Sequence, residues 1–310
     1  LTWSMPKVLI RLAGRTMLGH IIDRLVDAGV DHVTLVVGYL GDEIVEWATG
    51  SYPSIKIDYA VQEEMNGLAS AVNLASPMTG AGPTLVVLGD TLFSADLAPA
   101  FHSDRNMIAV RKVEDPRRFG VVVMDGERVE RLVEKPSEFV SDLAIVGIYG
   151  FRSGEGLMDA TERLIRSGRK TRGEFQLTDA MQMMLDEGEE FGVFPVTGWY
   201  DCGKPETILE TNRRLLDSGE GRGEGRSDGS VIVPPVSIHD DAVIISSVVG
   251  PHVSISSGCR VERSIISDSI VGCGTSITGA VITASILGDD AVIRGRPSRL
   301  NAGSSCEIDI

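Results

Sequence analysis

The chain has 310 residues, a formal net charge of −15 at pH 7 and 43% hydrophobic residues. This length is sufficient for two domains that each bury a core. No apolar run approaches the roughly 20 residues that a membrane span needs, and the acidic balance argues against nucleic-acid binding, which requires a basic face. The negative net charge remains compatible with a nucleotide ligand, because a few lysines, backbone N–H groups and a divalent cation make the electrostatic potential positive locally.

The four cysteines lie far apart and include no CxxC pair. This usage argues against a disulfide framework or a zinc site, and it favours reduced thiols in a cytoplasmic protein. No basic and apolar signal segment precedes the first expected elements. Because the first residue is Leu1 rather than Met, we expect the natural start to lie upstream. The cysteines are Cys202, Cys259, Cys273 and Cys306.

The first hundred residues alternate between amphipathic and apolar segments. Met17–Ala28 carries Leu18, Ile21, Ile22 and Leu25 at helical spacing, which predicts a helix. Short apolar strands separated by helices predict βαβ units and a mostly parallel sheet in this part. The further elements expected here are a strand at His32–Val37, a helix near Asp42–Trp47, a strand at Ile55–Val61, a helix at Leu68–Leu74 and a strand at Thr84–Leu88.

Beyond Asp104 the pattern changes to strands joined by turns, which predicts antiparallel additions to the sheet. Residues 1–217 are therefore expected to form an α/β domain with a Rossmann-like mixed sheet. The strands expected in this second part are Met107–Val113, Gly120–Met124, Val129–Val133, Ala144–Phe151 and Phe191–Val196, and the helices are Leu157–Arg166, Thr178–Leu185 and Pro205–Leu216.

The last third of the chain contains an internal repeat. Residues 218–229 (SGEGRGEGRSDG) are Gly-rich and charged, which is typical of a linker. Residues 230–310 then repeat a hexad in which an aliphatic residue precedes Gly and another aliphatic residue follows six positions later. This period suits a triangular solenoid with Gly at corners where φ is positive, and a sandwich of short strands is the alternative. The segment resembles the hexapeptide-repeat, left-handed parallel β-helix. The three copies begin at Ser247, Ser269 and Ser285.

Two aspartates follow expected strands. Asp90 ends Leu88-Gly89-Asp90, and Asp201 lies in Gly198-Trp-Tyr-Asp-Cys-Gly. Open α/β sheets bind ligands at the carboxyl ends of their strands, and two carboxylates together with phosphate oxygens suit Mg²⁺. The sequence therefore predicts a magnesium site at Asp90 and Asp201, although a turn or helix-cap role is the alternative for Asp90.

Lysines and glycine turns also lie at strand ends. Lys7 precedes the strand-like segment VLI with no acid beside it in the sequence, and Lys135 is followed by Pro136, which holds the preceding residue extended. The alternative for either lysine is a solvated surface charge. Gln62 begins the segment QEEMNGLA, in which its amide can recognise a base edge while Gly67 allows close backbone approach.

In chain order the motifs are PK, QEEMNGLASA, LGD, DPRRFGVV, EKP, VGIY, RGEFQLTDA and GWYDCGKPETILETNRRLL. This series resembles the sugar-1-phosphate nucleotidyltransferases, most closely the long-form glucose-1-phosphate thymidylyltransferases with a β-helix tail, and it covers almost the whole chain. The resemblance implies a GT-A/Rossmann-like catalytic domain and Mg²⁺ as cofactor. It also implies that the substrates are an NTP (dTTP or UTP) and a sugar-1-phosphate, and that the products are an NDP-sugar and pyrophosphate.

The resemblance also implies residue roles. Lys7, Asp90, Lys135 and Asp201 correspond to the catalytic residues, with Asp90 and Asp201 as metal ligands. Gln62 and Gly67, with Asp90, correspond to the nucleotide-binding residues. Gly120, Glu134, Lys135 and Gly147 correspond to the sugar-phosphate-binding residues. One departure is that the Asn usually found before VGIY is matched only by Asp142. The other is that the GxGTRxRP-type loop is not found. We therefore expect the residues that bind the triphosphate to lie upstream of Leu1, and we expect the 310-residue chain alone to be weakly active or inactive.

Several alternatives remain open from the sequence. The two substrates could instead be UTP with glucose-1-phosphate, or GTP with mannose-1-phosphate. A second, acetyltransferase activity would need a basic or His residue between coils, where only His239 and His252 are available. A non-catalytic regulatory homologue is the alternative from another class. The β-helix is expected to make the protein a homo-oligomer, with no nucleic-acid or membrane partner.

Overall fold

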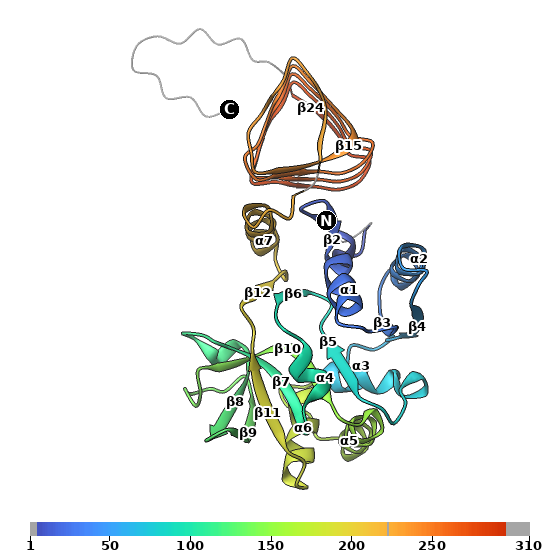
Figure 1. The fold of residues 1–310 in the computed structure, drawn as a ribbon, viewed down its shortest axis with the longest axis vertical. Coiled ribbons are helices and arrows are strands. Elements are labelled where there is room, and N and C mark those ends of the chain that lie inside the picture. Colours follow the sequence, from blue (N-terminus) through green and yellow to red (C-terminus); the bar gives the residue numbers. More distant parts are fainter. Residues whose placement is uncertain (1–4, 222, 296–310) are drawn as a thin grey trace. The chain divides into compact units, whose positions relative to one another are not determined.

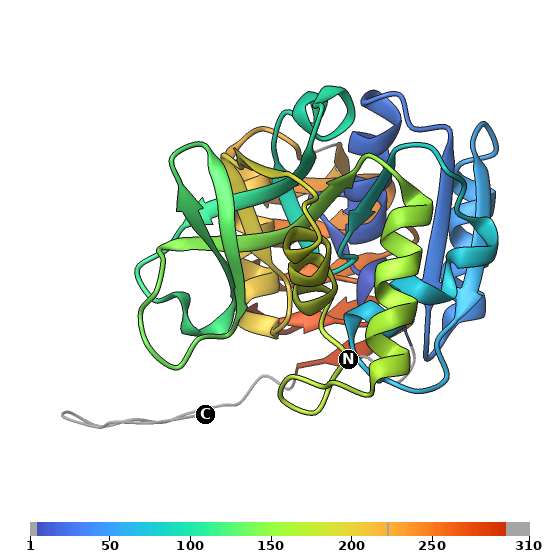
Figure 2. The same ribbon diagram turned by 90° about the horizontal axis from the view of Figure 1, so that it is seen from below.

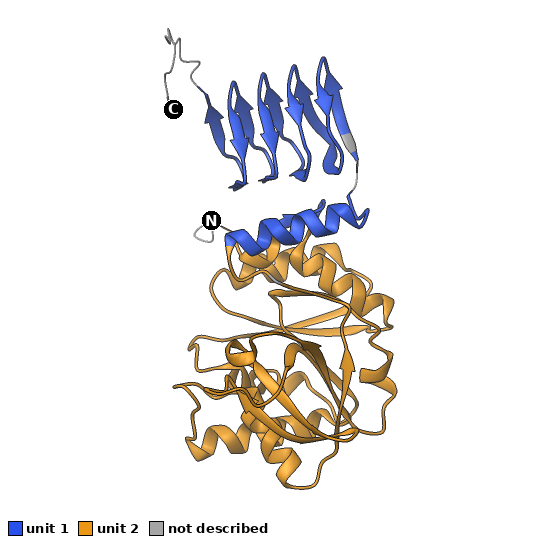
Figure 3. Ribbon diagram, turned by 90° about the vertical axis from the view of Figure 1, so that its left-hand side faces the viewer, with its two compact units in different colours: residues 1, 11–15, 205–310 blue, residues 2–10, 16–204 orange. Residues whose placement is uncertain are grey.

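The computed structural model describes residues 5–221 and 223–295, and for Asp201 and Glu224 it describes the backbone alone. The chain forms two compact units (Figure 3), which comprise residues 2–10 with 16–204, and residues 1, 11–15 and 205–310. This division differs from the predicted boundaries at 217 and 230, because residues 11–15 and the helix after Lys204 belong with the solenoid. The end of the predicted tail, including Cys306, lies outside the described residues.

The α/β unit is built on a mixed sheet in the order β11-β7-β10-β8-β9, with β5 also paired to β10. Only β7 and β11 run parallel, and the other pairs in this sheet are antiparallel. Figure 2 shows the β8–β9 hairpin, in green, at the edge of this sheet. The strands are β5 (Thr84–Val87), β7 (Asn106–Lys112), β8 (Gly120–Asp125), β9 (Arg128–Glu134), β10 (Leu143–Phe151) and β11 (Phe191–Pro195).

The mostly parallel sheet expected in the first hundred residues is limited to one pair of strands. Strands β3 (His32–Val37) and β4 (Lys56–Val61) pair in parallel over their whole length. Strand β5 instead runs antiparallel to β10, whose last eight residues are all buried. An apolar run indicates that a strand is buried but not which edge it joins, so the sequence pattern could not assign β5 to β10.

Short elements connect these strands, and the helices of the unit lie where the sequence predicts them, except for the short helix α4, which was not predicted. The helices are α1 (Met17–Asp27), α2 (Gly41–Ser51), α3 (Leu68–Leu74), α4 (Ala98–His102), α5 (Gly154–Ser167) and α6 (Leu177–Asp186). The remaining elements are the 3₁₀ turns η1 (Lys7–Leu9), η2 (Ser76–Met78) and η3 (Pro116–Arg118) and the strands β6 (Thr91–Ser94) and β12 (Gly198–Asp201). Among the described helices, none is long and apolar enough to cross a membrane.

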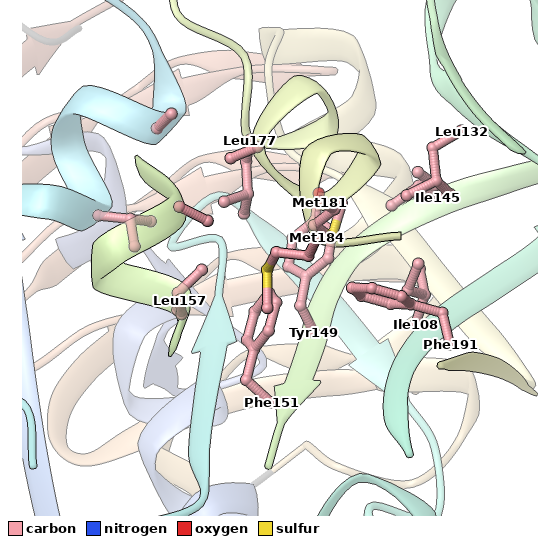
Figure 4. Packing of buried hydrophobic residues seen from close by; sticks show 14 of the residues in the cluster. Ile108, Leu132, Ile145, Tyr149, Phe151, Leu157, Leu177, Met181, Met184 and Phe191 are labelled. Carbon is pink, nitrogen blue, oxygen red and sulfur yellow. The ribbon is translucent and has the colours of Figure 1, made fainter. Parts of the chain in front are cut away.

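The main core lies between the sheet and helices α5 and α6 (Figure 4). Helix α5 begins after Ser153, whose hydroxyl accepts the N–H of Gly156, and it ends at Gly168 with φ +68°. These are the usual N-cap and left-handed C-cap arrangements. Its buried positions recur at helical spacing, with Leu157 and Leu164 fully buried. From the sheet, the rings of Phe151 and Phe191 meet edge to face at 6.5 Å.

The second unit contains a parallel β-solenoid of about four coils, which Figure 1 shows as a triangle viewed along the coil axis. Side A consists of β14 (Val231–Ile232), β16 (Val248–Val249), β19 (Ile265–Ser267) and β22 (Val281–Thr283). Side B consists of the first part of β15 (Val236–Ile245) with β17 (Val253–Ile255), β20 (Ile270–Val271) and β23 (Ile286–Leu287). Side C consists of the second part of β15 with β18 (Arg260–Glu262), β21 (Ser276–Thr278) and β24 (Val292–Arg294).

The coils are shorter than three full hexads. Stacked residues are 17 positions apart in the first coils, as for Val231 and Val248, and 16 apart in the last, as for Ser276 and Val292. One corner is turned by a single left-handed residue in each coil, including Ser246 at φ +47° and Arg263 at φ +46°. Of the predicted inward aliphatic residues, Val249, Ile255, Val271 and Ile277 are confirmed at 0–2% exposed, whereas Leu287 and Ile293 of the last coil pack against the same core but are only partly buried.

Glycines serve the solenoid in two ways. Gly250 has φ +109°, as predicted for a corner. Gly272 does not have a positive φ, but a Cβ there would lie 2.6 Å from the backbone carbon of Gly288 in the next coil. The predicted linker is also partly ordered, because β13 (Glu224–Asp228) pairs in parallel with β15. A Cβ on Gly225 would lie 2.5 Å from the Ile238 side chain, so close packing rather than flexibility accounts for at least this glycine.

Helix α7 (Pro205–Asp217) and the turn at residues 11–15 are joined to side B by polar contacts. The Asn212 side-chain oxygen accepts hydrogen bonds from the Ala13 N–H at 2.9 Å and the Ser254 hydroxyl at 2.7 Å. The Arg213 guanidinium pairs with Asp268, and His252 Nε2 lies 2.8 Å from Asp217. Side B is therefore covered, and all three residues of β17 are buried.

Candidate active site

The first part of the candidate site lies where β5 ends. The Asp90 carboxylate lies 3.0 Å from Lys7 Nζ, and these side chains are 45% and 29% exposed. One expectation about Lys7 is wrong, because Lys7 begins the 3₁₀ turn η1 rather than preceding a strand. Its acidic partner lies 83 positions away in the sequence. The structure thus brings together the PK and LGD motifs.

The second predicted metal ligand is placed by backbone pairing. Strand β12 runs antiparallel to β6, and Asp201 is opposite Thr91, the residue after Asp90. The Cys202 N–H donates to the Asp90 carbonyl at 3.1 Å. The backbones of the two aspartates are therefore neighbours on paired strands. In the described part of the chain, no cluster of three or more His, Cys, Asp or Glu side chains is suited to hold a metal ion.

The third part of the site is formed at the ends of β8 and β9, where Gly120 pairs with Glu134. The Glu134 side chain is 9% exposed, and its Oε2 accepts a hydrogen bond from the Thr178 hydroxyl at 2.8 Å. The Lys135 ammonium lies 3.5 Å from Oε1 of the same carboxylate. The backbone of Lys135 has φ +41°, so the expectation that Pro136 holds it extended is wrong. A Cβ at position 120 would lie 2.9 Å from Glu134 Oε2. Gly120 therefore provides the space for an ordered carboxylate.

Glu134 also affects the central strand. Tyr149 of β10 is buried, and burial together with the Glu134 charge raises the pKa of its phenol well above the usual range. Both effects disfavour a phenolate, because burial penalises the charged form and a nearby like charge adds repulsion. Tyr149 is therefore a neutral phenol at physiological pH and contributes no negative charge beside Glu134.

Gly147 connects the central strand to the LGD motif. It lies where the register between β10 and β7 shifts, and its φ of +89° favours glycine. A Cβ there would lie 2.7 Å from Leu88 Cδ1, while the Leu88 N–H donates to the Gly147 carbonyl at 2.9 Å. The predicted sugar-phosphate residue therefore packs against the segment that ends in Asp90.

The two predicted nucleotide-binding residues are placed differently. Gln62 directly follows β4, is half-buried, and has its N–H bonded to the Val37 carbonyl at 2.7 Å. Gly67 has φ +109°, and a Cβ there would lie 2.5 Å from the Phe175 carbonyl oxygen. The Phe175 N–H donates to the Asn66 carbonyl at 2.8 Å. Gly67 is thus fixed against the RGEF segment, whereas no described side-chain contact joins Gln62 to the other predicted residues.

Sequence reasoning missed Arg172. Its guanidinium donates to the Lys135 carbonyl at 2.6 Å, from a turn in which Arg172 and Gly173 both have positive φ. The motif RGEFQLTDA contains Arg172, but no role was predicted for it. Phe119 and Trp199 meet at 4.8 Å between ring centroids, which joins two further motifs. Asp142, the doubtful sugar contact, instead lies 3.7 Å from the Lys112 ammonium.

Lysines, an arginine, acidic residues and close-approach glycines thus lie at strand ends of one α/β unit, next in the chain to a parallel solenoid. Cationic and carboxylate side chains of this kind are suited to hold and align phosphate groups, which is the chemistry expected of an enzyme class that acts on phosphate esters. Comparison with known proteins agrees with this class, since residues 1–218 match the nucleotidyl transferase family model. The chain belongs to this family, and within it to the sugar-1-phosphate nucleotidyltransferases.

The names of the similar proteins describe several different activities. The chain is 33% identical to the low-salt glycan biosynthesis nucleotidyltransferase Agl11 of Haloferax volcanii, over 100% of this chain and 96% of that protein. It is 32% identical to a glucose-1-phosphate thymidylyltransferase of Streptomyces griseus, over 96% of this chain and 90% of that protein. The bifunctional protein GlmU of Methanocaldococcus jannaschii is 34% identical over 79% of this chain and 57% of its own length.

Proposed function

We propose that the protein transfers a thymidylyl group from dTTP to glucose-1-phosphate, giving dTDP-glucose and pyrophosphate. The observation that carries the reaction class is the pairing of Lys7 with Asp90 near β12, together with the Glu134–Lys135–Arg172 group in the same unit. The choice of glucose and thymine is supported by the similarity to the Streptomyces griseus thymidylyltransferase over nearly the full length of both proteins.

In this reaction an oxygen of the sugar phosphate attacks the α-phosphorus of the nucleotide, and a new P–O bond forms. The bond from the α-phosphorus to the oxygen that leads to the β-phosphate breaks, and pyrophosphate leaves. Both reactants are anions, so the site must reduce their repulsion and align them. Lys135 and Arg172 hold the sugar phosphate, and the buried Glu134 carboxylate accepts hydrogen bonds from sugar hydroxyls.

The residues present fit a magnesium ion by their chemistry. Asp90 offers a half-exposed carboxylate at the end of a strand, and Asp201 lies on the paired strand with its backbone beside it. Hard carboxylate oxygens are the ligands that Mg²⁺ prefers. When bound, the ion would supply positive charge against the triphosphate. Asp90 and Asp201 would hold the ion, and Lys7 would turn from Asp90 to the phosphates.

A substrate panel tests the proposal by pyrophosphate release with dTTP, UTP and GTP, each combined with glucose-1-phosphate or mannose-1-phosphate. The assay uses the protein with any coding sequence upstream of Leu1 included. We expect dTTP with glucose-1-phosphate to give the highest kcat/KM. A preference for UTP would support the uridylyltransferase alternative, and a preference for GTP with mannose-1-phosphate would refute the proposed substrates. Binding of dTTP without turnover of any pair would support a regulatory homologue.

A matched pair of lysine variants tests the site. Lys135→Gln is expected to raise the KM for glucose-1-phosphate by about tenfold or more, because a charge-assisted hydrogen bond to phosphate is lost. Lys56→Gln is the control, because Lys56 is a surface lysine that is 65% exposed and pairs with Asp58. Equal KM values for the two variants would contradict the role assigned to Lys135.

A further inference from the structure

Strands β3 and β4 run parallel (Figure 1), and exposed apolar side chains lie at or just beyond their carboxyl ends. Tyr39 is 71% exposed, Met65 is 69% exposed and Val61, the last residue of β4, is 52% exposed. We call Tyr39, Val61 and Met65 the apolar shelf. Large apolar side chains that are exposed together mark interaction sites, and open α/β sheets bind ligands at the carboxyl ends of their strands.

The shelf is centred on Gly38, which follows β3. Tyr39 is the next residue in the chain, and a Cβ on Gly38 would lie 2.8 Å from Met65 Cε. The Gln62 carbonyl oxygen lies 3.7 Å from the same position, and the Gln62 N–H donates to the Val37 carbonyl at 2.7 Å. Tyr39, the Met65 methyl group and the backbone of Gln62 therefore lie around one glycine, and a side chain at position 38 would displace Met65.

The turn that carries Tyr39 is strained. Leu40 has φ +58° and ψ +31°, which is the left-handed conformation that is unfavourable for a residue with a Cβ. Gly41 closes the turn by donating its N–H to the Gly38 carbonyl at 3.0 Å, and a Cβ on Gly41 would lie 2.6 Å from Val37 Cγ2. Strained backbone is concentrated at ligand sites, where the surrounding structure enforces it. The left-handed Leu40 is therefore a second indication that ligand binding requires Tyr39 at this place.

We propose that the apolar shelf packs against the nucleobase of the substrate nucleotide and that Met65 contacts the 5-methyl group of thymine. This inference rests on the proposed function. A nucleobase has apolar ring faces and a polar edge, and the strand ends offer both kinds of surface around Gly38. The Gln62 side chain carries a donor and an acceptor for the polar edge. The Met65 thioether adapts its shape and makes favourable contacts with aromatic rings.

The size of the shelf favours a nucleobase over a protein partner. Three apolar side chains cover only a small part of the roughly 800 Å² that each partner buries in a standard interface. A pyrimidine ring with one methyl group is of matching size. Removing one methyl group of a ligand from water changes a binding constant about fourfold. Met65 should therefore favour thymine over uracil by about fourfold.

Four nucleotides separate the methyl group from the ribose hydroxyl: dTTP, dUTP, ribothymidine triphosphate and UTP. We measure kcat/KM for each with saturating glucose-1-phosphate, using the protein with any coding sequence upstream of Leu1 included. Wild type should prefer the methylated base about fourfold in both the deoxyribose and the ribose pair. Met65→Ala should abolish both preferences and leave the ratio of dTTP to ribothymidine triphosphate unchanged. An unchanged methyl preference in Met65→Ala would overturn the proposal.

Failure of the proposed function gives a different result. If wild type turns over none of the four nucleotides with glucose-1-phosphate, the proposed function fails. The binding of dTTP and dUTP to wild type and Met65→Ala, measured by calorimetry, then decides the role of the shelf separately. A preference for dTTP that is lost in Met65→Ala would support the shelf as a nucleobase site, and equal affinities of wild type for the two nucleotides would overturn it.

A matched pair of tyrosine variants tests the aromatic part of the shelf. Tyr59 is 51% exposed and lies within β4 rather than beyond its carboxyl end, so Tyr59→Ala is the control for Tyr39→Ala. We expect Tyr39→Ala to weaken the binding of dTTP and dUTP alike, by about fivefold or more, because a stacked ring contacts the face that both bases share. Tyr59→Ala should change neither affinity. Equal effects of the two variants, with both folded by circular dichroism, would contradict the role of Tyr39.

Discussion

Gly147→Ala tests how the central strand supports the segment that ends in Asp90. The backbone at Gly147 has φ +89°, and a residue with a Cβ costs about 1–2 kcal/mol in the left-handed region. The new Cβ would lie 2.7 Å from Leu88 Cδ1 and 2.8 Å from Leu88 Cγ, well inside ordinary contact. Overpacking of this kind costs about 1–3 kcal/mol. We therefore expect the free energy of unfolding to fall by about 2–5 kcal/mol.

Gly168→Ala separates backbone strain from overlap. Gly168 has φ +68°, but a Cβ there would meet nothing within 4 Å. It should therefore lose only the strain component, about 1 kcal/mol. Both variants are compared with wild type by urea denaturation, with the slope checked for two-state behaviour. Equal losses at the two positions would refute the claim that contact with Leu88 is the larger effect at Gly147.

The double variant Gly147→Ala with Leu88→Ala locates the overlap. Leu88→Ala removes both of the closest atoms, so the two losses should not add, and we expect a favourable coupling of about 1 kcal/mol or more. The Leu88 N–H is bonded to the Gly147 carbonyl, and Asp90 lies two residues further on. Gly147→Ala should therefore also lower kcat about ten- to a hundredfold, since small displacements of catalytic groups are costly. Additive losses with unchanged kcat would refute the reasoning.

Three further variants test individual contacts. Thr178→Val removes the hydroxyl that orients Glu134 and should raise the KM for the sugar phosphate about tenfold without changing the KM for the nucleotide. Thr178→Ser should restore the KM for the sugar phosphate. A loss of stability with both KM values unchanged would contradict this positioning role. Asn212→Ala leaves the Ala13 N–H with only the more distant Ser254 hydroxyl as acceptor, and it leaves that hydroxyl without its own acceptor. Urea denaturation should therefore show that the free energy of unfolding falls by about 2–3 kcal/mol. A fall of less than about 0.5 kcal/mol would contradict this role of Asn212. Burial raises the pKa of the Cys259 thiol to about 11 from its usual 9.0. The unfolded chain therefore releases this proton first, and stability should fall by about 2 kcal/mol between pH 9 and 11 but not below pH 8; a Cys259→Ala variant with the same pH slope would refute this.

Local features of the fold could be predicted because they depend on local chemistry. The alternation of apolar residues located most of the longer helices and strands to within a few residues, and Gly-Asp after an apolar strand placed Asp90 at a strand end. The inward aliphatic positions of the solenoid followed from the same kind of pattern. In each case the prediction depends on the pattern of apolar side chains within a single helix or strand, and this pattern indicates which side chains are buried.

Features that depend on distant pairing could not be predicted. The contact between Lys7 and Asp90 joins residues 83 positions apart, and nothing beside Lys7 in the sequence indicates it. Residues 218–229 were interpreted as a linker because Gly-rich segments are usually flexible. The same composition also allows the close approach to β15 that the structure shows at Gly225. Glycine content alone does not distinguish flexibility from tight packing.

The contacts of Asn212 change how the solenoid should be regarded. The predicted boundary at residue 217 would make it a removable tail, but the chain passes between the units after Ile10, after Arg15 and after Lys204. The turn that holds Ala13 is bonded to Asn212 and Ser254 within the solenoid unit. Lys7 therefore lies just before a segment whose Ala13 N–H is shared between an acceptor on α7 and one on side B. A chain cut at residue 217 would retain every predicted catalytic residue and Asn212, but it would lose the Ser254 hydroxyl that accepts from Ala13 and donates to Asn212, at a cost of about 0.5–1.5 kcal/mol.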